Sequence, residues 1–280
     1  MTAAEGAGRL AARLAREDRL VTAFSGGADS ALLAAMAHEV LGTRALAVTA
    51  VSASLPGRER AAARDFARSR GLQHVEVCTD ELDRPSYRRN GADRCFHCKS
   101  ALFDAVAPLA SAMGARMALG TNLDDLSDHR PGQQAARARG AVFPLVDAGL
   151  TKAAVRAISQ ELGLATAAKP AAACLSSRIA YGDPVTPELL GQIERAEDAL
   201  HGAGFTRCRV RAHAGGTVAR IEVPAADLDR LLAARDDLTA LVRAAGFVFV
   251  TMDMDGLRSG SMNSLLPLHV VTPGAAGGTG

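Results

Sequence analysis

Residues 19–41, RLVTAFSGGADSALLAAMAHEVL, decide the fold of this chain. The apolar run RLVTAF, residues 19–24, predicts a buried strand, and ALLAAMAHEVLG, residues 31–42, predicts a helix. The turn SGGADS, residues 25–30, joins them with two glycines. A strand, a glycine-rich turn and a helix in this order are typical of parallel α/β sheets, which bind ligands at the carboxyl ends of their strands.

The alternation of strands and helices continues through the first 170 residues. Further strands are predicted at residues 45–53, 74–79 and 115–122, and further helices at 58–71, from about Lys99, and at 151–163. Gly71 is typical of a helix end and Thr151 of a helix start. The expected fold class is α/β, with a doubly wound parallel sheet in a first domain, residues 1–170.

A change of pattern after Pro170 predicts a second and smaller domain. Residues 171–186 contain Gly182 and Pro184, lie between Pro170 and Pro187, and are expected to form a linker loop that carries a cysteine. Residues 187–263 predict helix, strand, strand, one helix over 226–246, and a last strand, which is the order of a small α+β domain for substrate. Residues 264–280 are expected to form a disordered tail.

The composition indicates a soluble globular chain. Of its 280 residues, 48% are hydrophobic and 22% are charged, and 32 basic residues nearly cancel 30 acidic ones to leave a net charge of +2. This balance supplies no strong field for nucleic acid or a membrane surface. The sequence has no signal-peptide pattern and no run of roughly 18 apolar residues, so a cytoplasmic location is expected.

The SGGADS turn has the features of a phosphate-binding loop. Backbone amides and the helix dipole would face one anion there, and glycines permit its close approach. Asp29 is a poor phosphate ligand and is better explained by a bound Mg²⁺. The plain alternative is a glycine-rich turn without a ligand. The expected phosphate-site residues are Ser25, Gly26, Gly27, Asp29 and Ser30.

The end of the strand at residues 115–122 offers a second set of polar groups. In a doubly wound sheet this end would hold the nucleotide or its Mg²⁺. The expected residues are Gly120, Thr121, Asn122 and Asp125. Spacing alone does not decide which of Asp124, Asp125 and Asp128 would bind the metal, and His129 and Arg130 lie close by in the sequence.

Three of the five cysteines form a pattern. Cys95 and Cys98 make a CxxC pair at the start of a predicted helix, and Cys174 lies in the linker loop. The pair by itself fits a redox pair, half of a zinc site completed by Cys174 with His97 or His213, or two ligands of an iron–sulfur cluster. Cys174 could also act alone, as a nucleophile or sulfur donor. Cys78 and Cys208 are expected to be small buried hydrophobic residues in strands.

The SGGADS motif resembles the SGGxDS signature of the N-type ATP pyrophosphatases, which include GMP, NAD and asparagine synthetases and several tRNA-thiolating enzymes. The resemblance implies that the loop grips the pyrophosphate of ATP while a substrate attacks the α-phosphorus. ATP and Mg²⁺ are the implied cofactors, and the implied product is an adenylated substrate.

Further motifs narrow the resemblance. SGGADS, RCFHCK, GTNLDDLSDHRPG, CLSSRIAYG and GLRSGSMN, in this order, are similar to the LarE family of ATP-dependent sulfur insertases. The family thiolates pyridinium-3,5-biscarboxylic acid mononucleotide on the way to the nickel-pincer nucleotide of lactate racemase. Some members sacrifice one cysteine, matching Cys174, which becomes dehydroalanine. Others bind a four-iron four-sulfur cluster through three cysteines, and Cys95 and Cys98 favour this second type with Cys174 as the third ligand.

The substrate of this family would need fixed cationic groups. Arg209 and Arg211 alternate on a predicted strand, and by pattern alone an exposed strand face explains them equally well. The resemblance assigns these arginines to the mononucleotide phosphate. By analogy it also places Glu197 and Glu222 near the substrate, although solvated helix and strand faces explain them nearly as well, and Arg258 and Ser259 in support of the site. Ser177 and Arg178 are expected at the substrate too; Ser177 would donate to phosphate or merely cap its loop, and Arg178 would favour a thiolate at Cys174.

Other functions are weighed against this one. A tRNA-thiolating enzyme would share the fold, but two tyrosines, no tryptophan and a near-neutral charge are poor means of binding RNA. An amidating synthetase would need a glutaminase domain, which the sequence does not contain. A nucleotide sensor or a zinc-stabilised interaction module is the non-enzymatic alternative. Sulfide or a sulfur carrier is a possible sulfur source, and the family resemblance implies a homo-oligomer.

Overall fold

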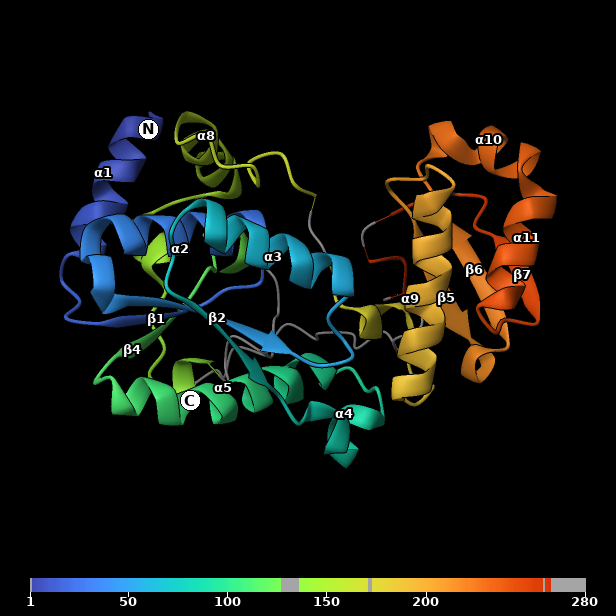
Figure 1. The fold of residues 1–280 in the computed structure, drawn as a ribbon, viewed down its shortest axis with the longest axis horizontal. Helices are drawn as coiled ribbons and strands as arrows, with labels where there is room; N and C mark the ends of the chain where they lie inside the picture. Colours follow the sequence, from blue (N-terminus) through green and yellow to red (C-terminus); the bar gives the residue numbers. More distant parts are fainter. Residues whose placement is uncertain (1, 127–135, 171–172, 259, 263–280) are drawn as a thin grey trace, which may run out of the picture.

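A computed structural model describes residues 2–126, 136–170, 173–258 and 260–262. The first half of the chain forms a parallel sheet of four strands in the order β3-β2-β1-β4, as the sequence predicts (Figure 1). The strands are β1 (Leu20–Ala23), β2 (Ala45–Val51), β3 (His74–Cys78) and β4 (Arg116–Leu119). Because β1 pairs with both β2 and β4, the order of strands changes direction at β1, where doubly wound folds bind their ligands.

Helices cover both faces of this sheet (Figure 1). They are α1 (Ala3–Leu14), α2 (Ala28–Leu41), α3 (Gly57–Ser69), α5 (Arg94–Ala112), α7 (Pro144–Asp147) and α8 (Lys152–Glu161). The short helix α4 (Pro85–Arg88) precedes α5, and its Tyr87 packs in the core of the second half. Neighbouring strand residues point to opposite faces, so Leu20 packs in a core with α1, α2, α3 and α8, while Val21 packs with α5 on the other side. Both side chains are fully buried.

Helix α1 has a complete capping box. The Thr2 hydroxyl accepts a hydrogen bond from the amide of Glu5 at 3.2 Å, and the Glu5 carboxylate accepts one from the amide of Thr2 at 2.8 Å. Leu10 and Leu14 pack into the core beside α2. This helix is an addition to the elements predicted from the sequence.

The second half forms a three-stranded sheet in the order β5-β6-β7, with β5 and β6 antiparallel and β6 and β7 parallel. Its elements are α9 (Pro187–Gly202), β5 (Arg209–His213), β6 (Val218–Glu222), α10 (Leu228–Ala233), α11 (Arg235–Ala244) and β7 (Phe249–Met252). The prediction of one helix over 226–246 was wrong, since the chain bends at Ala234. The apolar spacing of Leu231 and Leu238 continues across the bend, which hides it from a pattern analysis.

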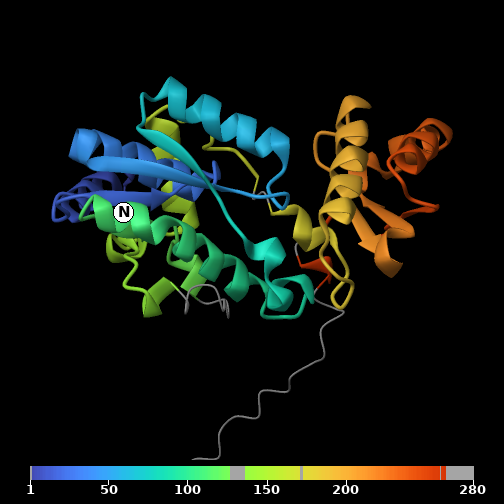
Figure 2. The same ribbon diagram turned by 60° about the horizontal axis from the view of Figure 1, so that its bottom comes forward.

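The segment between the two sheets is more ordered than the predicted loop. Residues Leu175–Arg178 form a 3-10 helix, η4, directly after Cys174. Leu175 and Ile179 are buried in the core of the second sheet, and Ile179 pairs with Ala212 of β5. Both ribbon views place η4 between the first sheet and α9 (Figure 2). The linker therefore fixes Cys174 between the two halves.

Helix α5 begins earlier than predicted. Its first residue is Arg94 rather than Lys99, because Asp93 marks the change to helical backbone and the amides of Phe96 and His97 already bond to the Asp93 carbonyl. Cys95 and Cys98 therefore lie in the first two turns of a long helix. In the described part of the chain, no helix is long and apolar enough to span a membrane.

Candidate active site

The serine hydroxyls of the SGGADS loop form hydrogen bonds within the loop. Ser30 Oγ donates to the Gly27 carbonyl at 3.1 Å, accepts from the Ser25 amide at 3.2 Å and lies 3.1 Å from Ser25 Oγ. Gly27 is the N-cap of α2, and no side chain caps the helix there. The first amides of α2 therefore keep their capacity to bind an anion.

Two glycines are required by close packing around this loop. Gly26 has a φ of +70°, and a Cβ atom there would lie 3.1 Å from the Cβ of Ala63 in α3. At Gly120, after β4, a Cβ atom would lie only 2.8 Å from the amide nitrogen of Ser30. Any larger residue at Gly120 would push the end of β4 away from the start of α2. The two predicted halves of the nucleotide site are thus in direct contact.

A buried asparagine links the carboxylates of the site. The side-chain amide of Asn122 donates to Asp29 Oδ1 at 3.2 Å, and its backbone amide donates to Asp125 Oδ2 at 3.2 Å. Burial raises the pKa of Asp29, the Asn122 hydrogen bond opposes this, and the charge of Asp125 raises it further. Asp124 accepts a hydrogen bond from the amide of Lys152 at 2.8 Å.

These residues suit a hard cation. Two carboxylates from neighbouring strand ends, Asp29 and Asp125, lie close enough for their charges to interact, and Mg²⁺ prefers carboxylate oxygens beside phosphate. Of the three aspartates left open by the sequence, Asp125 is the one whose charge raises the pKa of Asp29 in the described residues. Asp128, His129 and Arg130 lie outside the described residues, and so does Ser259. Thr121 follows β4 at the same edge of the sheet and is half-buried.

Three cations near the loop were missed by the sequence analysis. Lys169 Nζ donates to the Gly26 carbonyl at 3.0 Å and pairs with Glu59 at 2.7 Å. Lys152 and Arg156, in α8, lie close enough for their charges to lower the pKa of Asp29. Lys152 could have been found as the second residue of a predicted helix start, but nothing in the sequence relates Lys169 to a loop 143 residues earlier.

The structure brings the three predicted cysteines into one neighbourhood. Burial raises the pKa of Cys98 to about 12, and the charges of Cys174 and Cys95 raise it as well. Glu81 adds to the same effect; it is buried, and its Oε2 atom has no hydrogen-bond partner in the described residues. The sequence analysis missed this carboxylate because no motif surrounds it.

Three sulfur donors from two segments have the chemistry that iron–sulfur clusters require. Within the residues that the structure describes, however, no three His, Cys, Asp or Glu side chains are arranged as metal ligands. The two histidines considered for zinc are engaged elsewhere. His97 Nε2 lies 3.0 Å from Asp93, and His213 Nε2 accepts a hydrogen bond from Arg220 at 3.2 Å.

The predicted substrate residues form two buried ion pairs. Arg178 Nε donates to Glu197 Oε1 at 2.9 Å, and Arg211 Nη2 donates to Glu222 Oε2 at 2.8 Å. The guanidinium of Arg178 also holds the carbonyl of Cys174 at 3.1 Å, and that of Arg211 holds the carbonyl of Ser177 at 2.9 Å. Both arginines therefore brace the cysteine loop against the second sheet.

Arg209 differs from Arg178 and Arg211 in its contacts. Its side chain is half-buried, and no hydrogen bond or ion pair joins its guanidinium to any residue in the described ranges. Burial lowers the pKa of Arg209, and the charges of Arg211 and Arg178 lower it further. A partly buried cation beside two others stabilises a bound anion, because the anion replaces the missing counter-charge.

Comparisons with known proteins agree with this geometry. Residues 9–87 match the asparagine synthase family. Over 259 residues, 92% of this chain and 93% of the relative, 35% of positions are identical to pyridinium-3,5-bisthiocarboxylic acid mononucleotide synthase of Lactiplantibacillus plantarum, a LarE protein. This chain belongs to the LarE family. An uncharacterized protein of Synechocystis is 42% identical over 252 residues, 89% of this chain and 93% of that protein.

The two other cysteines of this LarE family member lie outside the predicted set of three. Cys208 is buried, as predicted, although it precedes β5 rather than lying in it, and its sulfur lies 3.7 Å from His201 Nε2. The prediction that Cys78 is buried was wrong. Cys78 is exposed because it ends β3, the edge strand of the first sheet.

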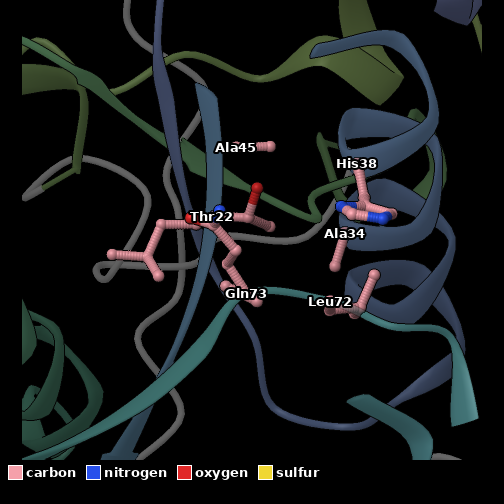
Figure 3. Close-up of a pocket in the computed structure, with 8 residues that line it drawn as sticks. Thr22, Ala34, His38, Ala45, Leu72 and Gln73 are labelled. Atoms are coloured by element: carbon pink, nitrogen blue, oxygen red, sulfur yellow. The ribbon is translucent and has the colours of Figure 1, made fainter. Parts of the chain in front are cut away.

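A small pocket in this LarE family member lies away from the phosphate loop. Figure 3 shows Thr22 of β1 and His38 of α2 pointing into it, with Gln73 and Leu72 on its other side. His38 lies in the last turn of α2, whereas the phosphate loop precedes the first turn. Thr22 Oγ1 and His38 Nδ1 have no hydrogen-bond partner among the described residues. The pocket is therefore separate from the nucleotide site.

Proposed function

We propose that this chain is an ATP-dependent sulfur transferase that acts on pyridinium-3,5-biscarboxylic acid mononucleotide. The proposal is supported by membership of the LarE family and by the relative in Lactiplantibacillus plantarum, whose name states that it makes the bisthiocarboxylic acid mononucleotide. The observation that carries it is the joining of Asp29, Asn122 and Asp125 beside the SGGADS loop. That arrangement offers a cation site and a phosphate site at one sheet edge.

The first step is activation of a substrate carboxylate. One carboxylate oxygen attacks the α-phosphorus of ATP, pyrophosphate leaves, and an acyl adenylate results. The amides at the start of α2 and the hydroxyls of Ser25 and Ser30 bind the leaving pyrophosphate. Asp29 and Asp125 would hold Mg²⁺, which would neutralise negative charge on the phosphates. Lys169 is placed to bind phosphate if it releases Gly26.

The mononucleotide is held from the second sheet. Arg209, whose guanidinium has no partner among the described residues, binds its phosphate. Arg178 and Arg211 are held by Glu197 and Glu222 and keep the surface beside Ser177 in place. This division assigns binding to Arg209 and positioning to the two ion pairs.

The second step replaces AMP by sulfur. A sulfur nucleophile attacks the acyl carbon of the adenylate, AMP leaves, and a thiocarboxylate is formed. Cys95, Cys98 and Cys174 would hold a four-iron four-sulfur cluster, which supplies a renewable sulfur when bound. Sulfide or a sulfur carrier would then reload it. Two rounds give the bisthiocarboxylic acid used for the nickel-pincer nucleotide of lactate racemase.

A second sulfur source uses Cys174 alone. Its thiolate attacks the acyl adenylate and expels AMP, and the resulting thioester loses the thiocarboxylate by elimination, which leaves dehydroalanine at position 174. Arg178 supports this route because it contacts the carbonyl of Cys174.

Cytoplasmic location and a homo-oligomeric state belong to the same proposal, whereas tRNA thiolation gains no support from the +2 charge.

The test is an anaerobic reaction of the full chain with ATP, Mg²⁺ and the mononucleotide. The proposal predicts AMP and pyrophosphate in equal amounts, with AMP formation dependent on the mononucleotide. A chain that hydrolyses ATP to ADP, or that forms AMP only with tRNA, would contradict it. Mass analysis of residue 174 after turnover separates the two sulfur sources.

A further inference from the structure

A closed set of three hydroxyl groups lies beside the cysteines. Tyr87 Oη is 2.6 Å from Ser176 Oγ and 2.8 Å from Ser54 Oγ, and Ser176 Oγ lies 2.9 Å from Ser54 Oγ. All three residues are buried. They come from the turn after β2, from α4 and from η4, so the three bonds join three separate segments.

A buried arginine makes a second connection to the same place. Arg94 is the first residue of α5, and its Nη1 atom donates to the carbonyl of Ser176 at 2.8 Å and to the side-chain oxygen of Asn90. The side-chain amide of Asn90 in turn donates to the carbonyls of Ala180 at 2.8 Å and Asp183 at 2.9 Å. Asn90 is fully buried and has a φ of +55°, a conformation that asparagine tolerates better than most residues.

These contacts connect the two cysteine segments without using a sulfur atom. Arg94 directly precedes Cys95, and Ser176 is the second residue after Cys174. The amide of Leu175 adds a hydrogen bond to the Ser54 carbonyl at 2.9 Å. A buried polar network costs free energy unless every member is satisfied, so its benefit over an apolar core lies in fixing one arrangement.

We propose that Tyr87, Asn90 and Arg94 are positioning residues that hold the Cys174 loop against the helix bearing Cys95 and Cys98. The inference rests on the proposed function, in which these sulfurs act at one centre. Tyr87 fixes the loop from the side of α4, and Arg94 fixes it from the first turn of α5. The network keeps Cys174 close to Cys95 and Cys98 before any sulfur source is loaded.

The experiment measures cysteine proximity in the full chain, without ATP, substrate or cluster. Serine replaces Cys78 and Cys95, and alanine replaces Cys208, so that only Cys98 and Cys174 remain as cysteines. Dibromobimane, a short reagent that fluoresces strongly when it joins two thiols, then reports the anaerobic cross-linking rate. Monobromobimane reports the labelling rate of each single thiol.

Two variants test the network in this background. Arg94→Gln should slow cross-linking by about tenfold, because the buried hydrogen bond from Arg94 Nη1 to the Ser176 carbonyl is lost. Tyr87→Phe should slow it by about threefold, because the bond between Ser54 and Ser176 survives. The matched controls are Arg89→Gln, at an exposed arginine of the same region, and Tyr181→Phe, which keeps the ring beside Arg94. Both controls should leave the rate within twofold.

Cross-linking within twofold of the background in both Arg94→Gln and Tyr87→Phe would overturn the proposal. If Arg94→Gln instead raises single-thiol labelling to the rate of the urea-unfolded chain, that variant has lost its fold. The cross-linking rate of Tyr87→Phe then decides the proposal, because this variant retains the buried ring. The readout is independent of catalysis. A chain that shows the expected loss of cross-linking but never thiolates the mononucleotide refutes the proposed function and leaves the positioning role intact.

Discussion

The side-chain amide of Asn122 donates a hydrogen bond to Asp29 Oδ1 at 3.2 Å, across 93 residues of sequence. Asn122 is fully buried and Asp29 is half-buried. The bond joins the Asp29 carboxylate, in the first turn of α2, to the segment that follows β4. The proposed cation site therefore depends on a contact between two strand ends.

Replacement of Asp29 tests that site. Asp29→Ala should reduce AMP and pyrophosphate formation by at least about 100-fold. The Mg²⁺ that neutralises the phosphates during attack on the α-phosphorus loses one of its carboxylate ligands in this variant. Radiolabelled ATP with chromatographic separation of AMP measures the effect. Asp65→Ala, at a carboxylate that is 71% exposed in α3, is the control and should retain full activity. Equal AMP formation by Asp29→Ala would remove Asp29 from the site.

Arg209 should govern substrate affinity. Arg209→Gln should raise KM for the mononucleotide by about 10- to 100-fold and change kcat little, because a charge-assisted phosphate contact is lost in ground and transition states alike. Steady-state kinetics at saturating ATP give both constants. Arg207→Gln, two residues away and exposed, should leave KM unchanged. A fall in kcat without a rise in KM would place Arg209 elsewhere in the mechanism.

The CxxC pair should matter for sulfur transfer and not for activation. Cys95→Ala should preserve formation of the acyl adenylate and mononucleotide-dependent pyrophosphate release but stop thiocarboxylate formation after the first turnover. Anaerobic quench experiments with mass detection count products per chain. Cys78→Ala, at the exposed cysteine of β3, should behave as the unmodified chain. Sustained thiolation by Cys95→Ala would contradict the three-cysteine cluster, because sacrificial Cys174 supplies only one sulfur per chain.

Glu76 supplies a pH-dependent contribution to stability. Hydrogen bonds from Arg60 and Arg64 lower the pKa of Glu76 to about 2 in the folded chain, against an ordinary value of 4.5. Its contribution is complete above pH 4.5 and disappears as the pH falls toward 2. After a discount for solvent screening, Glu76→Gln should cost about 1–2 kcal/mol at pH 7 and about none near pH 2.

Urea unfolding at several pH values checks this expectation. Glu161→Gln, at an exposed carboxylate that ends α8, is the control and should change the free energy of unfolding little. A constant difference between Glu76→Gln and the unmodified chain from pH 7 to pH 2 would show that the ion pairs do not stabilise the fold.

The motifs allowed more of the fold to be predicted than of the side-chain pairing. The four parallel strands and the SGGADS turn follow from local patterns, since apolar runs and glycines act within a few residues. Arg178 and Arg211 were also singled out, but their pairing with Glu197 and Glu222 depends on how η4 packs against the second sheet. No spacing rule in a single sequence contains that information.

The clearest failures have the same origin. Lys169 reaches Gly26 only because the chain returns past α3 before entering the linker, and it pairs there with Glu59. The burial of Cys78 was mispredicted because an edge strand cannot be distinguished from a central strand by its apolar pattern. In both cases the tertiary arrangement decides, and local sequence does not.

The most direct measurement counts AMP and incorporated sulfur in one anaerobic reaction of the full chain with ATP, Mg²⁺, the mononucleotide and sulfide. The account predicts one AMP for each oxygen replaced by sulfur, and no AMP when the mononucleotide is omitted. AMP released without sulfur in the product, or a product unchanged in mass, would contradict the assignment of this chain as a sulfur transferase.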